Sequence, residues 1–330
     1  MRLLSALSLL FSPLLLTQCV EKADHRPVSA GTLAKLDTQV VSKAQFMEML
    51  KHHGPRPTAP VTVPMDILAR LPIVDVQIGP KGKVPMMLDT GASRTMIQAS
   101  LAVKKKLPIL NPTEMTVEMK GVVGSEQGRI GLLDPLTVGT WSVHDYPCFV
   151  RTYQSQMLYL ADFPESLLGF DLAHENCTYL TLDYPRNRAV FGFGQNYTAR
   201  PGARTSKTPF IVKKGVPFIT VKSGGVSWEA LVDSGSFNGI EINEEIAARL
   251  KLQNQGQKIE GLYLLSIGGT VTSSEANMRT VKLKDLNVFS GTYRDAEVDI
   301  SPGIPRIGSF FLKDYRVTFD FKRKLLWLEW

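Results

Sequence analysis

The sequence contains few cysteines and histidines and has only one long hydrophobic run. There are 3 cysteines and 5 histidines among 330 residues. The histidines include an adjacent pair, His52-His53, and none of them has a spacing suited to zinc. Beyond the N-terminus no segment reaches the roughly 20 apolar residues that a membrane-spanning helix needs. We therefore expect no metal ion, and no membrane span in the body of the chain.

Patterns that several enzyme classes need are also missing. Gly192-Phe193-Gly194 lacks the third glycine and the following helix of a nucleotide-binding loop. The sequence has no Gly-x-Ser-x-Gly motif and no cysteine in a reactive Cys/His neighbourhood. These absences disfavour nucleotide-dependent chemistry and covalent hydrolysis of these kinds, and we expect no cofactor.

The positive charge of the chain does not indicate a nucleic-acid partner. The net charge of +7 could favour anionic partners. However, the basic residues are single or in short groups such as Lys104-Lys105-Lys106, without interleaved aromatics for stacking on bases. A solvated surface is the better interpretation.

Composition and length favour a large globular fold. Hydrophobic residues make up 44 % and charged residues 21 % of the chain, which is close to ordinary globular usage. The length suggests two domains or one two-lobed unit. The 20 prolines and 26 glycines are spread along the chain, as expected for many short strands joined by turns.

The N-terminus has the pattern of an export signal. Arg2 precedes the apolar run Leu3–Leu16, which is too short to span a bilayer. Leu16–Cys19 then resembles a bacterial lipoprotein lipobox, although Gln18 stands where Gly, Ala or Ser is expected. Val20 is not the Asp that marks inner-membrane retention. We expect residues 1–19 to direct export to the periplasm or the outer membrane, with Cys19 as the candidate lipid anchor and sole membrane contact.

The next segment, residues 20–65, is expected to be accessory. Ser42 can cap a short helix that ends at Gly54, surrounded by polar residues and prolines. This composition is typical of a tether, and a propeptide is the alternative.

Export would also place Cys148 and Cys177 in an oxidising compartment, which permits a disulfide. The sequence sets no distance between these two thiols, and we favour two separate buried ones.

From residue 66 onward the chain repeats itself. Strand, turn and strand lead from Pro72 to Asp89, and the same order leads from Pro217 to Asp233, one residue shorter. Each Asp is followed by a short capped helix, a glycine-containing stretch, a hydrophobic-Gly element and two final strands. We expect lobes at residues 66–194 and 209–330, joined by a polar linker at 195–208.

The repeat places one Asp-Thr/Ser-Gly tripeptide at the same point of each copy. One such tripeptide is a weak signal, because these are common turn residues, but two at matching points of a repeat are hard to obtain by chance. Two carboxylates in contact cannot both ionise easily, so they share a proton and can act together as base and acid on water and a peptide bond. Asp89 and Asp233 are therefore the candidate catalytic residues.

The residues after each aspartate suit a symmetric arrangement. Thr90 and Ser234 supply hydroxyls that could lock the two loops together, and Gly91 and Gly235 permit close backbone approach. Two-fold symmetry brings equivalent residues face to face. The pair could form within one chain, as a monomer, or between like residues of a homodimer.

At this point the motifs resemble a known superfamily. Leu88–Ser93 with Leu167–Gly169 looks like one half of a retropepsin-type aspartic protease. Val232–Gly235 with Ile307–Asp320 resembles the C-terminal half of the pepsin–retropepsin superfamily. The resemblance covers about residues 70–330. It implies an all-β, bilobal, pepsin-like fold built from two β-barrel lobes with short helices, and a peptide or protein substrate in a cleft beneath hairpin flaps.

Two further features follow from the resemblance. The flap candidates, chosen by position and glycine content, are Gly121, Gly124, Gly268 and Gly269. Arg306 departs from the pattern, since an apolar residue is expected before Ile307-Gly308. Facing the aspartates, this cation would lower their pKa values; facing solvent, it would have no effect.

The leading hypothesis is an aspartic endopeptidase of the cell envelope. The alternative is a non-catalytic envelope lipoprotein that uses the same fold to bind a peptide or a partner, and a third is a zymogen held inactive by residues 20–65. A binding module has little need of paired like charges, which favours catalysis.

Overall fold

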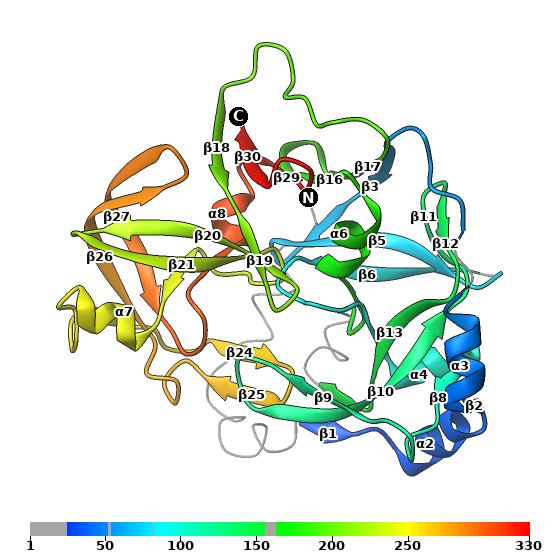
Figure 1. The fold of residues 1–330 in the computed structure, drawn as a ribbon. Coiled ribbons are helices and arrows are strands. Elements are labelled where there is room, and N and C mark those ends of the chain that lie inside the picture. Colours follow the sequence, from blue (N-terminus) through cyan, green and yellow to red (C-terminus); the bar gives the residue numbers. More distant parts are fainter. Residues whose placement is uncertain (1–24, 52–53, 81, 156–162) are drawn as a thin grey trace, which may run out of the picture.

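The computed structural model describes residues 25–51, 54–80, 82–155 and 163–330, and shows a two-lobed β protein (Figure 1). The predicted export signal, with Cys19, and the pair His52-His53 lie outside the described residues. Among the residues described, no helix is long and apolar enough to cross a membrane.

The segment before the first lobe packs on that lobe. It contributes β1 (His25–Pro27), α2 (Ala30–Asp37), β2 (Val40–Val41), α3 (Lys43–Met49) and β3 (Val61–Pro64). The predicted cap at Ser42 is confirmed, because its side chain accepts the N–H of Gln45 in a capping box. Leu36 and Phe46 are buried at 0 % and 4 % exposure. These described parts of residues 20–65 are thus integrated into the fold.

The first lobe is a large, mainly antiparallel sheet with two short helices. Its strand order is β12-β11-β5-β6-β15-β7-β13-β10-β8-β2, with β4 beside β5 and β9 beside β10. The elements are β4 (Asp66–Leu68), β5 (Leu71–Ile78), β6 (Lys83–Asp89), β7 (Met96–Gln98), α4 (Ala99–Lys105), β8 (Ile109–Leu110), β9 (Val117–Lys120), β10 (Ser125–Leu133), β11 (Leu136–Val138), β12 (Trp141–Val143), β13 (Tyr146–Arg151), β14 (Tyr153–Ser155), β15 (Leu167–Gly169) and α6 (Phe170–Asn176).

The second lobe repeats the central part of this order. Its sheet runs β19-β20-β21-β28-β22-β27-β26-β23, and β26 also pairs with β20, which closes the sheet on itself. The elements are β19 (Ile211–Lys213), β20 (Val216–Ser223), β21 (Val226–Asp233), β22 (Ile240–Ile242), α7 (Glu244–Arg249), β23 (Gln257–Lys258), β24 (Tyr263–Ser266), β25 (Gly269–Thr272), β26 (Arg279–Val288), β27 (Gly291–Ile300), β28 (Arg306–Gly308) and α8 (Ser309–Leu312).

A six-stranded sheet contains strands from both halves of the chain and lies between the lobes in Figure 1. Its order is β18-β30-β29-β16-β17-β3. At its centre Thr181 of β16 pairs with Thr318 of β29, and their buried hydroxyls are 2.8 Å apart. The added elements are β16 (Tyr179–Asp183), a 3₁₀ turn (Tyr184–Arg186), β17 (Arg188–Gly192), β18 (Thr205–Pro209), β29 (Arg316–Asp320) and β30 (Leu325–Glu329).

The strand pattern follows from alternating burial in the sequence. Every second residue of these strands, Val74, Val76 and Ile78 in β5 and Trp228, Ala230 and Val232 in β21, belongs to one apolar core that extends through both lobes. Burial of apolar surface on this scale is the main stabilising contribution. The prediction of an all-β, bilobal fold with short helices is confirmed.

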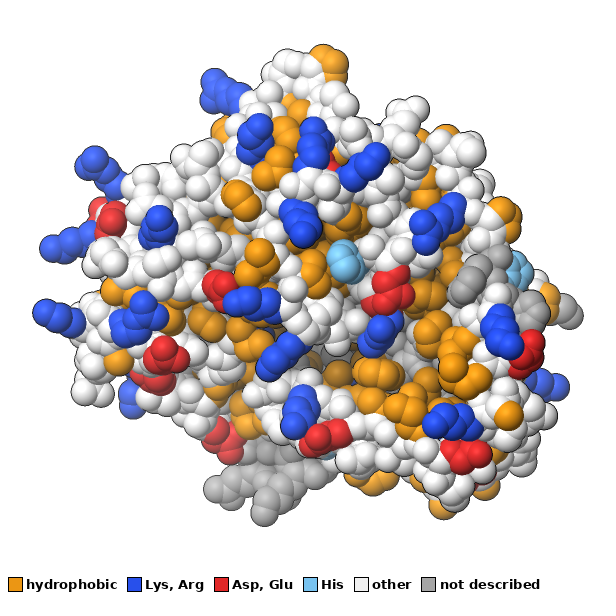
Figure 2. All heavy atoms as spheres, in the orientation of Figure 1, with side chains coloured by type: hydrophobic (Ala, Val, Ile, Leu, Met, Phe, Trp, Pro, Cys, Tyr) orange, Lys and Arg blue, Asp and Glu red, His pale blue; other side chains and the backbone are white. Residues whose placement is uncertain are grey.

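The charged side chains fit the interpretation of a solvated surface. On the face shown in Figure 2, Lys and Arg side chains are spread over both lobes and interspersed with Asp and Glu.

Cys148 and Cys177 are both free, and burial raises the pKa of each thiol. The interpretation of two separate thiols agrees with this arrangement.

Candidate active site

The two aspartates end equivalent strands of the two lobes. Asp89 is the last residue of β6 and Asp233 the last of β21. In each lobe a short strand pairs in parallel with the Asp strand, and it places Gly169 opposite Asp89 and Gly308 opposite Asp233. The sequence repeat is therefore a structural repeat with identical register, and both aspartates of the site come from one chain.

Thr90 and Ser234 connect the two loops by a reciprocal set of hydrogen bonds. The N–H of Thr90 donates to Oγ of Ser234, and the N–H of Ser234 donates to Oγ1 of Thr90, both at 2.9 Å. Each hydroxyl in turn donates to a carbonyl of the opposite strand, Val232 at 2.7 Å and Leu88 at 2.6 Å. Both side chains are fully buried. This network fixes the position of one aspartate relative to the other.

The two glycines allow the carboxylates to approach the opposite loop. A Cβ at Gly91 would overlap the carboxylate of Asp233, and one at Gly235 would overlap that of Asp89. Each glycine also donates its N–H to the carboxylate of its own loop, at 2.8 Å for Asp89 and 2.9 Å for Asp233. The close approach of the two carboxylates thus depends on the absence of side chains at these two positions.

The electrostatic environment favours a shared proton. Burial and the negative charge of Asp233 raise the pKa of Asp89 well above its usual range, and the two side chains are hydrogen-bonded. Burial also raises the pKa of Asp233, although Arg306 opposes the increase. A pair of this kind titrates jointly, so that one proton is retained over a pH range in which an isolated carboxyl would be ionised.

Two residues behind the aspartates, Ser309 and Tyr184, were not identified as site residues from the sequence, although Ser309 lies within the segment that resembles the superfamily. Ser309 donates from its hydroxyl to the carbonyl of Ser234 at 2.8 Å, and the hydroxyl of Tyr184 lies 3.1 Å from that of Ser309. Burial raises the pKa of Tyr184, and the charges of both aspartates add to this effect. Tyr184 is thus a neutral buried phenol close to the pair. Only folding brings it there, since 125 residues separate it from Ser309 in the chain.

The flap candidates lie in two hairpins whose tips meet. Gly121 and Gly124 flank the β9–β10 turn, Gly268 lies in the β24–β25 turn, and Gly269 begins β25. A Cβ at Gly268 would overlap the backbone of Gly124. The Figure 1 view shows the hairpins approaching from opposite lobes.

Polar contacts join these tips. The hydroxyl of Ser266 accepts the N–H of Val122 at 2.7 Å. The N–H of Gly268 points to the carboxylate of Glu126 at 3.4 Å. Glu126 is itself held by Arg151 at 2.6 and 3.1 Å and by Nε2 of His25 at 2.6 Å. A buried charge network therefore supports the first hairpin and reaches the second.

Apolar residues pack between the first hairpin and the aspartate strands. Met119 of β9 belongs to one buried cluster with Met96 and Leu167, and Ile267 from the opposite tip packs against it. On the second-lobe side, Val122 of the first hairpin and Arg306 both lie next to Gly303. A Cβ on Gly303 would be 3.0 Å from Val122 and 3.2 Å from Arg306. The hairpins are thus packed near the strands that carry the site.

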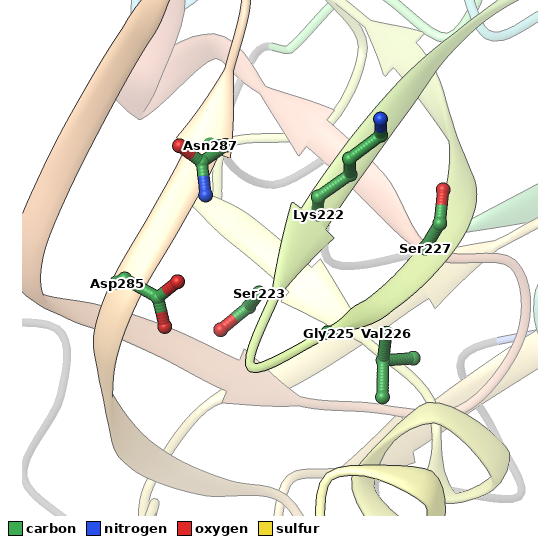
Figure 3. Close-up of a pocket in the computed structure, with 7 residues that line it drawn as sticks. All are labelled: Lys222, Ser223, Gly225, Val226, Ser227, Asp285 and Asn287. Carbon is green, nitrogen blue, oxygen red and sulfur yellow. The ribbon is translucent and has the colours of Figure 1, made fainter.

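The cavity drawn in Figure 3 is not part of this site. It has a volume of about 350 Å³ and lies at the β20–β21 turn, where Lys222, Ser227 and Asp285 are among its lining residues. This turn is at the opposite end of β21 from Asp233, roughly 23 Å away along an extended strand.

In the part of the chain that the structure describes, no group of three His, Cys, Asp or Glu side chains could hold a metal ion.

Comparisons with known proteins agree with this arrangement. Residues 74–172 match the family model described as aspartyl protease. Among solved structures, the crystal structure of aspartic proteinase from Irpex lacteus aligns with a TM-score of 0.52 at 16 % identity, covering 82 % of this chain and 97 % of that one. A comparison with curated proteins found no match. The sequence match and the shared fold confirm the resemblance to the pepsin–retropepsin superfamily.

Proposed function

We propose that this chain, which has the fold of the pepsin–retropepsin superfamily, is an aspartic endopeptidase that uses Asp89 and Asp233 to activate water. The family match and the fold suggest peptide hydrolysis. The observation that most directly supports catalysis is the close approach of the two carboxylates, each of which lies against the glycine of the opposite loop. Confining two like charges costs free energy. Their joint titration supplies a base and an acid in one place.

The proposed reaction needs only this pair and water. The ionised carboxylate accepts a proton from water as the water oxygen bonds to the peptide carbonyl carbon, and the protonated carboxyl donates to the carbonyl oxygen. The C–N bond then breaks as the dyad donates a proton to the leaving nitrogen and recovers one from a hydroxyl of the tetrahedral intermediate, which restores the shared proton. Thr90 and Ser234 hold the carboxylates in place, and no residue is covalently modified. The substrate would be an extended peptide lying beneath the two hairpins.

The cellular location remains part of the proposal. The apolar N-terminal run and the lipobox-like Leu16–Cys19 support export and anchoring at Cys19 in the envelope of a bacterium. Labelling with a tagged fatty acid tests this point, and a Cys19→Ser variant that still takes up the label would contradict it.

The catalytic proposal is tested by replacing each aspartate with its amide. Asp89→Asn and Asp233→Asn should each abolish cleavage of a peptide library while the circular dichroism spectrum and the unfolding transition persist. The matched control is Asp314→Asn, because Asp314 is an exposed carboxylate that pairs with its neighbour Lys313. Full activity in either dyad variant excludes the shared-dyad mechanism.

The same variants distinguish a non-catalytic module. If the protein only binds peptides, the wild type will cleave no peptide in the library. The wild type and all three variants will then bind peptides equally well.

A further inference from the structure

The geometry points to Arg306 as a positioning residue that makes the two aspartates unequal, so that Asp233 is the ionised partner and Asp89 carries the shared proton. This inference rests on the proposed function. It begins with the departure seen in the sequence, where a cation stands before Ile307-Gly308 in place of an apolar residue.

The register of the two lobes makes Arg306 the counterpart of Leu167. Arg306 lies opposite Leu231, two residues before Asp233, and Leu167 lies opposite Met87, two residues before Asp89. Both side chains are buried, at 6 % and 7 % exposure. The same position beside each aspartate strand is therefore apolar in one lobe and cationic in the other.

Arg306 is held rigidly in this position. Its Nε lies 3.1 Å from the carboxylate of Glu241, which is fully buried. The guanidinium also donates to the carbonyl of Ile304 at 3.3 Å and to that of Pro302 at 3.2 Å. Few conformations are open to a side chain with these contacts, so its charge has a defined place relative to β21.

The partner of Arg306 is connected to the loop of Asp233. Glu241 accepts from the hydroxyl of Ser236 at 3.3 Å and from Nδ2 of Asn238 at 2.9 Å. Ser236 follows Gly235 directly in the chain, and its backbone N–H bonds to the carbonyl of Asp233 at 3.3 Å. The ion pair thus supports the backbone that positions Asp233.

Stability alone is a weak reason for burying this ion pair. Replacing a buried ion pair by packed apolar residues is often neutral or stabilising, because desolvation of two charges offsets their attraction. Leu167 shows that the equivalent position of the other lobe accepts an apolar side chain. An effect on the neighbouring carboxylates gives the pair a role that an apolar residue could not have.

The charged and titratable groups around Asp233 act in opposite directions. Those facing it are Asp89, Tyr184, Arg306 and Glu241, and Asp299 lies beyond Glu241. After burial, the largest influence on the pKa of Asp233 is the lowering by Arg306, which exceeds the opposite effect of Glu241. For Asp89, burial and the charge of Asp233 both raise the pKa, and the equivalent position beside its strand holds the apolar side chain of Leu167. The proton therefore favours Asp89.

The pH profile of kcat/KM provides the test. A cation near Asp233 favours the ionised form of this carboxyl and so lowers the first apparent pKa of the dyad. This pKa sets the acid limb of the profile, the low-pH side on which activity rises with pH. Removing the cation raises the pKa and moves the acid limb to higher pH. Arg306→Gln should shift the limb upward by about one pH unit, in line with the usual effect of one nearby opposite charge. Arg306→Lys should keep the wild-type limb. Glu241→Gln leaves the cation unopposed and should shift the limb downward.

A purely structural role predicts a different result. Arg306→Gln and Glu241→Gln would then both lose activity, with the acid limb unmoved or moved in the same direction, and either result overturns the inference. Arg249→Gln is the control, because Arg249 is an exposed arginine that bonds to the carbonyl of Ser227.

Two additions keep the test informative if a single variant fails to fold. The double variant Arg306→Leu/Glu241→Gln avoids an unpaired buried charge, and it should still shift the limb upward, by less than Arg306→Gln. In parallel, the carboxyl carbons of ¹³C-labelled aspartate, assigned with the two dyad Asn variants, report the titration without any activity. A wild type that cleaves no peptide contradicts the proposed function. A carboxyl titration unchanged by Arg306→Gln or by the double variant contradicts the role of Arg306.

Discussion

Thr90 and Ser234 hydrogen-bond to each other's backbone across the junction of the two lobes, each N–H reaching the opposite hydroxyl at 2.9 Å. The same hydroxyls donate to Val232 and Leu88, the residues before the two aspartates. Four buried hydrogen bonds thus join the two loops that carry the carboxylates. They determine the geometry of the pair more directly than any contact of the carboxylates themselves.

This network predicts a stability effect that depends on one hydroxyl. Thr90→Val keeps the shape of the side chain but leaves the N–H of Ser234 and the carbonyl of Val232 without that partner. Buried groups left unpaired cost about 1–3 kcal/mol, so the free energy of unfolding should fall by that amount. Thr90→Ser retains the hydroxyl and should lose less. Urea unfolding of both variants measures the difference, and equal losses would show that the methyl group, not the hydrogen bonds, matters.

The glycines after the aspartates predict a steric effect on activity. Gly91→Ala and Gly235→Ala each place a Cβ on the opposite carboxylate. Neither glycine has a positive φ, so overlap rather than backbone strain produces the effect. Displacing a catalytic group by about 1 Å can cost on the order of 100-fold in rate, and we expect a loss of that size in kcat/KM. Gly31→Ala is the control, because its nearest neighbouring atom would be 3.9 Å away. Normal activity in both site variants would mean that the carboxylates can separate without loss.

The contact between the hairpin tips predicts an effect on peptide cleavage. Ser266→Ala removes the hydroxyl that accepts the N–H of Val122 and weakens the meeting of the two tips. The same hydroxyl also accepts the N–H of Val123 at 3.3 Å and donates to the carbonyl of Ile267 at 3.0 Å. Loss of the shortest of these hydrogen bonds, worth about 1 kcal/mol, should by itself lower kcat/KM roughly 5-fold while the unfolding transition changes little. Steady-state kinetics on a cleaved peptide measure this. Ser274→Ala, at an exposed serine of the same region, should match the wild type; an equal loss there would remove the role of the tip contact.

Local signals allowed much of the fold to be predicted. Alternating apolar residues indicated the strand that begins at Pro72, because a strand with one buried face has a period of two, and the apolar runs after the following turns indicated the strands that end at Asp89 and Asp233. A short capped helix after each aspartate is confirmed, since Gln98 caps α4 by accepting the N–H of Ala99 and Asn243 caps α7 by accepting the N–H of Ile246. The matching order of elements in the two halves indicated the duplication. These features depend on neighbours in the chain, and the sequence records them directly.

Contacts between distant residues were not predictable in this way. Glu126 binds His25, which is 101 residues away, and Arg151, which is 25 residues away. No spacing rule relates these positions, because they meet only after the first hairpin folds against β13 and β1. The same holds for Tyr184 and Ser309 behind the aspartates.

The sequence by itself determined the two aspartates, their threonine, serine and glycine neighbours, and the duplicated unit that carries them. Only the tertiary structure decided that both aspartates meet within one chain, and that Arg306 is turned inward to Glu241 instead of outward to solvent. The physical reason is that a repeat defines equivalent positions in the two lobes, whereas the burial of a charge depends on the partners that the folded chain provides. Arg306 is buried because Glu241 is present to pair with it.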